Sequence, residues 1–189
     1  MRFSKIEIRD LVLAWLLISV AFGILYSEGL LDINKLLLSF VFSLLTVGIS
    51  FLLHELMHKY LAQKYGLWAE FRASYSMLMF AVLMSFLGFI LAAPGGVYIR
   101  GLLTREKEGK ISFVGPLMNI ILALIFLFLY LGFKGTFFVY GFRINALLGI
   151  FNMLPIPSFD GFKVYLWNKK IYFITLIFSG LLLFVTYVV

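Results

Sequence analysis

The sequence predicts an all-α polytopic membrane protein with about five to six transmembrane helices. A re-entrant or β-like element is expected between the second and fourth apolar runs. Hydrophobic residues make up 63% of the 189 residues and charged residues 13%, whereas soluble domains average about 45–50% and about 25%. Most of the apolar runs approach the roughly 20 residues that cross about 30 Å of hydrocarbon. The six runs are 11–26, 36–61, 77–93, 113–131, 137–154 and 171–189.

Composition also excludes a disulfide-stabilised scaffold and argues against a nucleic-acid-binding protein. The chain has no cysteine, so neither a disulfide nor a thiolate metal site can form. The net charge of +7 could suggest nucleic acid as a partner. In so apolar a chain it instead indicates the enrichment of Lys and Arg on the cytoplasmic side of a membrane. We therefore expect the lipid bilayer, and no nucleic acid, as a partner.

The first run, 11–26, follows Arg2, Lys5 and Arg9 but has no small-residue cleavage site after it. These features predict a retained helix rather than a signal peptide. No linker-like segment interrupts the chain, so residues 1–189 are expected to form a single membrane-embedded domain.

The second run contains His54-Glu55-Leu56-Met57-His58. Histidines four residues apart share one face of a helix, so both imidazoles can reach one metal ion. Glu55 can then take a proton from a water molecule at that ion. Alternatively, the two histidines hydrogen-bond neighbouring helices or relay protons. Because burying ionisable groups in an apolar helix is costly, the motif favours a functional site that binds zinc.

The third run, 77–93, decides the topology through its effect on the distribution of positive charges. If all six runs cross, the two sides carry seven and eight Lys and Arg residues, with Arg143 omitted. If 77–93 dips in and returns, the side of the N-terminus carries thirteen and the other side two, Lys35 and Lys134. The second layout obeys the positive-inside rule. It predicts five spans, a re-entrant element and a cytoplasmic N-terminus, whereas an ordinary short helix is the alternative for 77–93.

A third ligand is needed, because catalytic zinc commonly has three protein ligands. Of nine carboxylates, Asp160 alone directly follows an apolar helix with a built-in interruption, Pro155 and Pro157. A plain turn at the surface is the alternative. His54 lies nineteen residues after Lys35, or about 28 Å along a helix, so it approaches the cytoplasmic face. In the five-span layout Asp160 emerges on that same face.

Three segments together resemble the signatures of the site-2 protease family. Members of this family are intramembrane zinc metalloproteases that cut transmembrane helices. The segments are His54-Glu55-x-x-His58, Gly115-Pro116-x-x-Asn119 and Asn152-x-x-Pro155-x-Pro157-x-x-Asp160-Gly161. The resemblance covers about residues 36–165, flanked by helices 11–26 and 171–189, and short archaeal-type members are most similar. It implies that one Zn²⁺ ion is bound by His54, His58 and Asp160.

By the same resemblance, Glu55 would be the general base and Asn152 would help to hold the substrate carbonyl. Gly95, Gly96 and Val97 would belong to a membrane-embedded strand that pairs with extended substrate. The implied function is zinc-dependent endopeptidase activity on transmembrane protein substrates, as in regulated intramembrane proteolysis. The implied location is a multi-pass position in the cell membrane, with the active site near the cytoplasmic face. The alternative is a zinc or proton transporter with the same ligands, but transporters usually place such sites at midplane between repeats, and no repeat is evident.

Overall fold

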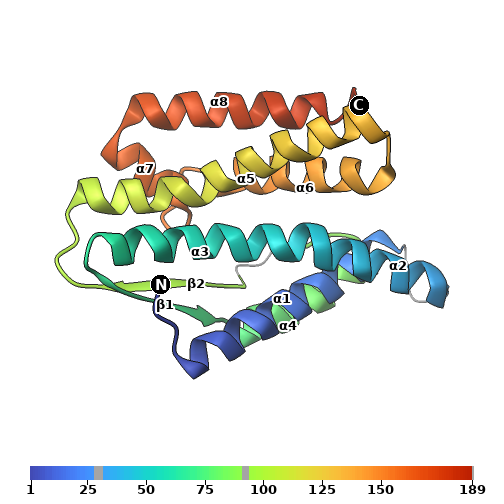
Figure 1. The fold of residues 1–189 in the computed structure, drawn as a ribbon, viewed down its shortest axis with the longest axis horizontal. Coiled ribbons are helices and arrows are strands. Elements are labelled where there is room, and N and C mark those ends of the chain that lie inside the picture. The colour runs from blue at the N-terminus through green and yellow to red at the C-terminus, as the bar shows by residue number, and fades with distance from the viewer. Residues whose placement is uncertain (28–31, 91–93, 189) are drawn as a thin grey trace. The chain divides into compact units, whose positions relative to one another are not determined.

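The computed structural model describes residues 1–27, 32–90 and 94–188 (Figure 1). Within them the chain divides into two compact units, unit 1 and unit 2. Unit 1 comprises Met1–Glu55 and Ala69–Tyr98, and unit 2 comprises Leu56–Trp68 and Ile99–Val189. The elements in chain order are α1 (Lys5–Tyr26), α2 (Ile33–Ser43), η1 (Leu44–Gly48), α3 (Ile49–Lys64), β1 (Trp68–Ala73), α4 (Tyr75–Ser85), β2 (Gly95–Arg100), α5 (Arg105–Phe133), α6 (Thr136–Asn152), α7 (Asp160–Trp167) and α8 (Lys169–Val185).

The predominantly helical, apolar architecture is confirmed. Three helical stretches among the described residues are long and apolar enough to cross a membrane: Lys5–Tyr26, Ile33–Lys64 and Arg105–Phe133. Helices α6 and α8 have 17 residues each, or about 26 Å of rise, slightly less than the hydrocarbon thickness of about 30 Å. The total of five to six spans therefore stays a prediction.

Helix α4 begins two residues before the segment expected to be re-entrant, 77–93, and covers the first part of it. Its 11 residues span only about 16 Å, which is too short to cross the hydrocarbon core. Gly88 follows it with a φ of +84°, a conformation that glycine adopts without a steric penalty. Residues 91–93 of the predicted run lie outside the described residues, and so does Val189 at the end of the sixth run. The re-entrant path stays a prediction.

A two-stranded sheet of β1 and β2 follows α3. Strand β2 confirms the β-like element expected between the second and fourth apolar runs, whereas no strand was expected at β1. The burial of side chains alternates along β1. Ala69 and Phe71 are buried, whereas Glu70 and Arg72 are partly exposed, as the two faces of a strand require. A Cβ on Gly95 would overlap the Arg72 carbonyl oxygen, so glycine allows the two strands to approach closely.

In unit 1, α1 packs against α2, η1 and α4. The closest approach is at Gly48 of η1, where a Cβ would overlap the Trp15 ring. Trp15 Nε1 donates a hydrogen bond to the Leu44 carbonyl, 3.0 Å away. Because η1 is one turn of π-helix, its carbonyls are displaced from the regular i→i+4 pattern. Such single turns occur frequently at functional sites, and this one lies directly before α3.

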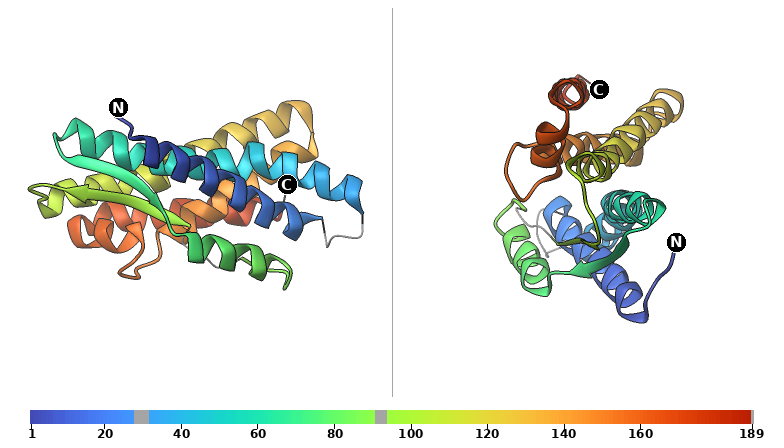
Figure 2. Two further views of the ribbon diagram at one scale, coloured as in Figure 1. Left: turned by 90° about the horizontal axis from the view of Figure 1, so that it is seen from below. Right: turned by 90° about the vertical axis from the view of Figure 1, so that its left-hand side faces the viewer.

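In unit 2, α5 packs against α6 and α7, and α6 packs against α8 (Figures 1 and 2). A core cluster comprises Ile120, Ala123, Phe142, Ala146 and Leu182. The buried amide groups inside this apolar unit are paired, as burial of polar groups requires. Asn119 Nδ2 donates to Asn145 Oδ1 at 3.2 Å, and Asn145 Nδ2 donates to the Gly141 carbonyl at 2.8 Å. The first bond ties α5 to α6, and the second lies within α6.

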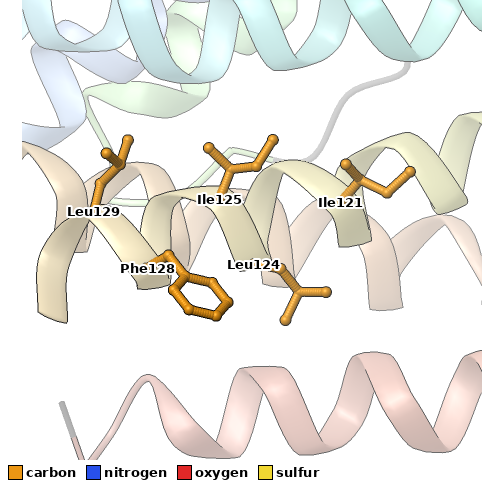
Figure 3. Close-up of a pocket in the computed structure, with 5 residues that line it drawn as sticks. All are labelled: Ile121, Leu124, Ile125, Phe128 and Leu129. Atoms are coloured by element: carbon orange, nitrogen blue, oxygen red, sulfur yellow. The ribbon is translucent and has the colours of Figure 1, made fainter.

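A pocket on α5 is lined entirely by apolar side chains (Figure 3): Ile121, Leu124, Ile125, Phe128 and Leu129. Phe128 is exposed, as expected for a helix surface that contacts lipid. A pocket without convergent polar groups offers no catalytic chemistry, so the functional site must lie elsewhere.

Candidate metal centre

His54 and His58 lie one turn apart on α3. Both are buried, with 5% and 7% of their surface exposed. Buried imidazoles need partners for their ring nitrogens. Helix α3 is continuous across the boundary between the two units, which lies after Glu55. One helix therefore carries both histidines.

His58 has a partner at each ring nitrogen. Nδ1 lies 2.7 Å from the Ile111 carbonyl oxygen of α5, and Nε2 lies 3.0 Å from Asp160 Oδ2. Because a carbonyl can only accept, Nδ1 carries the hydrogen in the neutral ring. This leaves the Nε2 lone pair directed toward Asp160. Metal-binding histidines are typically oriented in this way, by a backbone carbonyl on the other ring nitrogen.

Asp160 is the first residue of α7 and is carried there by a tightly folded connection after α6. A Cβ on Gly161 would overlap the backbone of Met153, so glycine is required for the chain to pass so close to the end of α6. Met153 is itself fully buried in a cluster with Val164 and Tyr172. The Asp160 side chain is only 13% exposed, unlike a carboxylate in a surface turn. The segment from Pro155 to Gly161 therefore directs the Asp160 carboxylate inward.

His54, His58 and Asp160 form the one group of three potential metal ligands found among the described residues. Each offers one ligand atom, and these atoms all lie within 4.8 Å of one another. Tetrahedral zinc with bonds of 2.0–2.1 Å would place neighbouring ligand atoms about 3.3 Å apart. The 3.0 Å between His58 Nε2 and Asp160 Oδ2 is close to that value. The donor set of two imidazoles and one carboxylate therefore fits zinc, a pattern known from catalytic sites.

Glu55 directly follows His54 on α3 and is 8% exposed. It is not part of the ligand group. A buried carboxylate adjacent in sequence to a ligand, yet outside the ligand set, is the arrangement expected of a general base. Its catalytic role stays a prediction.

The remaining predicted residues lie on other elements. Asn152 ends α6, and its Nδ2 donates to the Leu148 carbonyl of the same helix at 3.0 Å. Gly95, Gly96 and Val97 lie on β2 in unit 1. Gly95 is required by the contact with β1, whereas a Cβ on Gly96 would meet open space. The roles of these four residues in substrate binding stay predictions.

Sequence reasoning missed the environment of Glu7 and Asp10, two carboxylates near the start of α1. They are 0% and 3% exposed. Glu7 Oε1 accepts a hydrogen bond from Phe71 N at 2.9 Å, and Asp10 Oδ2 accepts one from Ala73 N at 3.3 Å. Their spacing of three residues, which puts both on one helix face, was the available signal.

Three proteins of known name are similar to this chain. "Putative zinc metalloprotease MJ0611" of Methanocaldococcus jannaschii is 44% identical over 178 residues, covering 90% of this chain and 89% of the relative. "Zinc metalloprotease MJ0392" of the same organism is 29% identical over 69% of this chain and 34% of its own length. "Putative zinc metalloprotease YwhC" of Bacillus subtilis is 29% identical over 64% of this chain and 65% of its own length.

No family model matches the chain. No solved structure matches it. The similarity to the relative at 44% identity nonetheless extends over almost the whole chain, and so spans the positions of all three motifs. The chain therefore belongs to the same family of zinc metalloproteases, the site-2 protease family that its motifs resemble.

Proposed function

We propose that the protein is an intramembrane zinc-dependent endopeptidase that cleaves transmembrane or membrane-proximal segments of membrane protein substrates, as in regulated intramembrane proteolysis. The observation that carries this proposal is the group of two buried histidines, His54 and His58, and the partly buried Asp160, with ligand atoms within 4.8 Å of one another. Two of these residues lie on a stretch apolar enough to cross a membrane. The names of the relatives support a protease rather than a transporter.

The three ligands would hold one Zn²⁺ ion, which supplies Lewis acidity that polarises the scissile carbonyl and acidifies water. Glu55 takes the proton from the attacking water and then delivers it to the leaving amine. The Ile111 carbonyl keeps His58 in the tautomer whose Nε2 can bind metal. Asn152 orients the substrate carbonyl.

The substrate must expose a peptide bond that a transmembrane helix normally conceals. A helix satisfies its carbonyl and amide groups internally, and unpaired groups in hydrocarbon cost several kcal/mol each. Strand β2 offers an alternative partner, because an extended segment added beside it would pair the released backbone groups. We therefore propose that residues around Gly96 and Val97 bind the unwound substrate.

We further propose a multi-pass protein of the cell membrane, with a cytoplasmic N-terminus and the active site near the cytoplasmic face. The charge asymmetry of the five-span layout supports this orientation. So does a contact within unit 2, where Lys107 Nζ lies 5.8 Å from the centre of the Tyr65 ring. Tyr65 directly follows the last residue of α3. The start of α5 and the end of α3 therefore belong to the same face, as expected if the chain between them returns to the side it left.

The test is cleavage of a model single-span substrate by the full chain reconstituted in liposomes, together with measurement of bound zinc. Wild-type protein should cleave, and Glu55→Gln should retain zinc but lose at least roughly 100-fold in rate, the smallest effect typical of a general base. A matched control is Glu106→Gln, because Glu106 is exposed and pairs with Lys110 on its own helix. Equal cleavage by wild type and Glu55→Gln would refute the proposal.

A further inference from the structure

Helix α1 carries two carboxylates that the zinc chemistry does not use. Glu7 and Asp10 lie one turn apart near its start and are almost completely buried. Burying a carboxylate costs several kcal/mol unless hydrogen bonds compensate it. The hydrogen-bond partners of Glu7 and Asp10 therefore show which part of the fold the two carboxylates stabilise.

The partners include two backbone amides of one strand, and Asp10 also pairs with Arg9 of its own helix. Glu7 accepts from Phe71 N and Asp10 from Ala73 N, and Asp10 Oδ1 also accepts from the Tyr75 hydroxyl at 2.6 Å. Along a strand, the amides of residues i and i+2 point to the same edge. The Arg72 carbonyl lies against Gly95 of β2, so Phe71 and Ala73 face the opposite, outer edge. The two carboxylates therefore occupy the outer edge of β1.

The carboxylates of α1 prevent a further strand from being added at the outer edge of β1. Exposed edges of a sheet present unpaired amides and carbonyls to any extended chain. In the sheet of two strands that the structure describes, one edge of β1 pairs with β2 and the other is bound by α1. A substrate strand can therefore be added only at the outer edge of β2.

The same helix also contacts the turn that leads into the zinc-binding helix. Trp15 Nε1 donates to the Leu44 carbonyl of η1, and Gly48 of η1 lies against the Trp15 ring. Helix α3, with His54 and Glu55, follows η1 directly. All of these contacts lie within unit 1. Near its start, helix α1 is thus attached to β1. Farther along, at Trp15, it is attached to η1, the turn that leads into α3.

We infer that Glu7 and Asp10 are positioning residues for the substrate. By fixing β1, and through it β2, to α1, they keep the substrate-accepting edge at a constant distance from Glu55. They therefore determine which peptide bond of the bound strand is cut. This inference rests on the proposed function, because it concerns the placement of a substrate for that reaction.

The experiment measures KM, kcat, bound zinc and the position of the cut for the single-span substrate in liposomes, with mass spectrometry of the products. Glu7→Leu removes the acceptor for Phe71 N. We expect a roughly tenfold higher KM, as for the loss of one buried hydrogen bond, and cuts spread over neighbouring bonds with zinc unchanged. Glu7→Gln retains an acceptor oxygen and should restore most of the single cut.

A second variant is included because a buried substitution can impair folding. Tyr75→Phe removes one hydroxyl from an exposed ring and leaves both carboxylates in place, so a smaller shift in the same direction is expected. Glu106→Leu serves as the exposed control and should cut as wild type does. A single wild-type cut with unchanged KM in Glu7→Leu and Tyr75→Phe would refute positioning while proteolysis itself remained. If wild type and Glu55→Gln were equally inactive, the proposed function would fail, and this inference with it.

Discussion

At the scale of single residues, local spacing determined which side chains could be predicted. His54 and His58 are four residues apart, so helix geometry alone places them on one face, and the structure brings them together with Asp160. Glu7 and Phe71 are 64 residues apart, and no local rule connects them. Ser4 and Glu7 also have the spacing of a capping box, and the Ser4 hydroxyl caps the helix by accepting from Glu7 N.

Removal of the third ligand should abolish zinc binding. In Asp160→Ala, His58 Nε2 loses the carboxylate now 3.0 Å away, and two imidazoles alone hold zinc weakly. Even outer partners of zinc ligands are worth roughly 10–100-fold in affinity, so we expect a loss of at least about 100-fold. Titration with zinc, followed by a competing chelator, measures it. Full zinc occupancy and activity in Asp160→Ala would show that another group is the third ligand.

Gly48 should not tolerate a methyl group. A Cβ there would overlap the Trp15 ring and the Ser19 hydroxyl, so Gly48→Ala should destabilise the protein by about 1–3 kcal/mol. The matched control is Gly132→Ala in α5, where a Cβ meets open space and alanine favours the helix by about 0.5–1 kcal/mol. Thermal unfolding in detergent measures both. Equal stability of the two variants would contradict the packing at η1.

At the scale of elements, long apolar helices were predictable and the short elements between them were less so. The glycines of β2 and its run of Val97, Tyr98 and Ile99 indicated a strand, and the structure confirms one there. Strand β1 was missed because its stability comes from β2 and from carboxylates on α1. The π-helical turn η1 was also missed, because a continuous apolar run gives no sign of its altered hydrogen bonds.

The connection before α7 should be sensitive to one methyl group. In Gly161→Ala the new Cβ would overlap the Met153 backbone, which cannot move aside as a flexible side chain can. Asp160, the preceding residue, would be displaced, and zinc affinity should fall by roughly tenfold or more. Gly180→Ala on α8 is the control, because its Cβ would make ordinary contacts. Wild-type zinc affinity in Gly161→Ala would show that this close passage does not position Asp160.

Proline in β2 tests whether the strand binds substrate. Val97→Pro removes a backbone donor and fixes φ, so cleavage of a helical substrate should decrease while zinc remains bound. Leu102→Pro is the control, because Leu102 is exposed and lies after the end of β2, so proline there removes a backbone donor outside the strand. Unchanged turnover by Val97→Pro would argue against strand addition at this edge.

At the scale of the whole molecule, the membrane topology links the charge distribution to the metal site. Asp160 and His58 both lie in unit 2 and are in contact, and this pair agrees with the five-span layout, which puts the end of α3 and the start of α7 on one face. Lys107 at the start of α5 lies over Tyr65 just after α3, and Arg100 lies over Trp68, with 5.1 Å between the guanidinium and the ring centre. These pairs place basic side chains beside aromatic rings, as is common at a membrane interface.

The last prediction concerns the side of the membrane on which Lys107 lies. The chain has no cysteine, so single cysteines can be introduced and labelled with a membrane-impermeant thiol reagent from either side. Cysteines at Lys64, Lys107 and Lys169 should react from the cytoplasmic side, and a cysteine at Lys134 should react from outside. The five-span and six-span layouts agree on Lys64 but place Lys107 on opposite faces, so this position distinguishes them. If α4 and the residues after it crossed the membrane, Asp160 would lie about 30 Å from the histidines, far beyond a zinc–oxygen bond of about 2 Å. Labelling of Lys107 from outside in active protein would therefore refute both the re-entrant path and the ligand set.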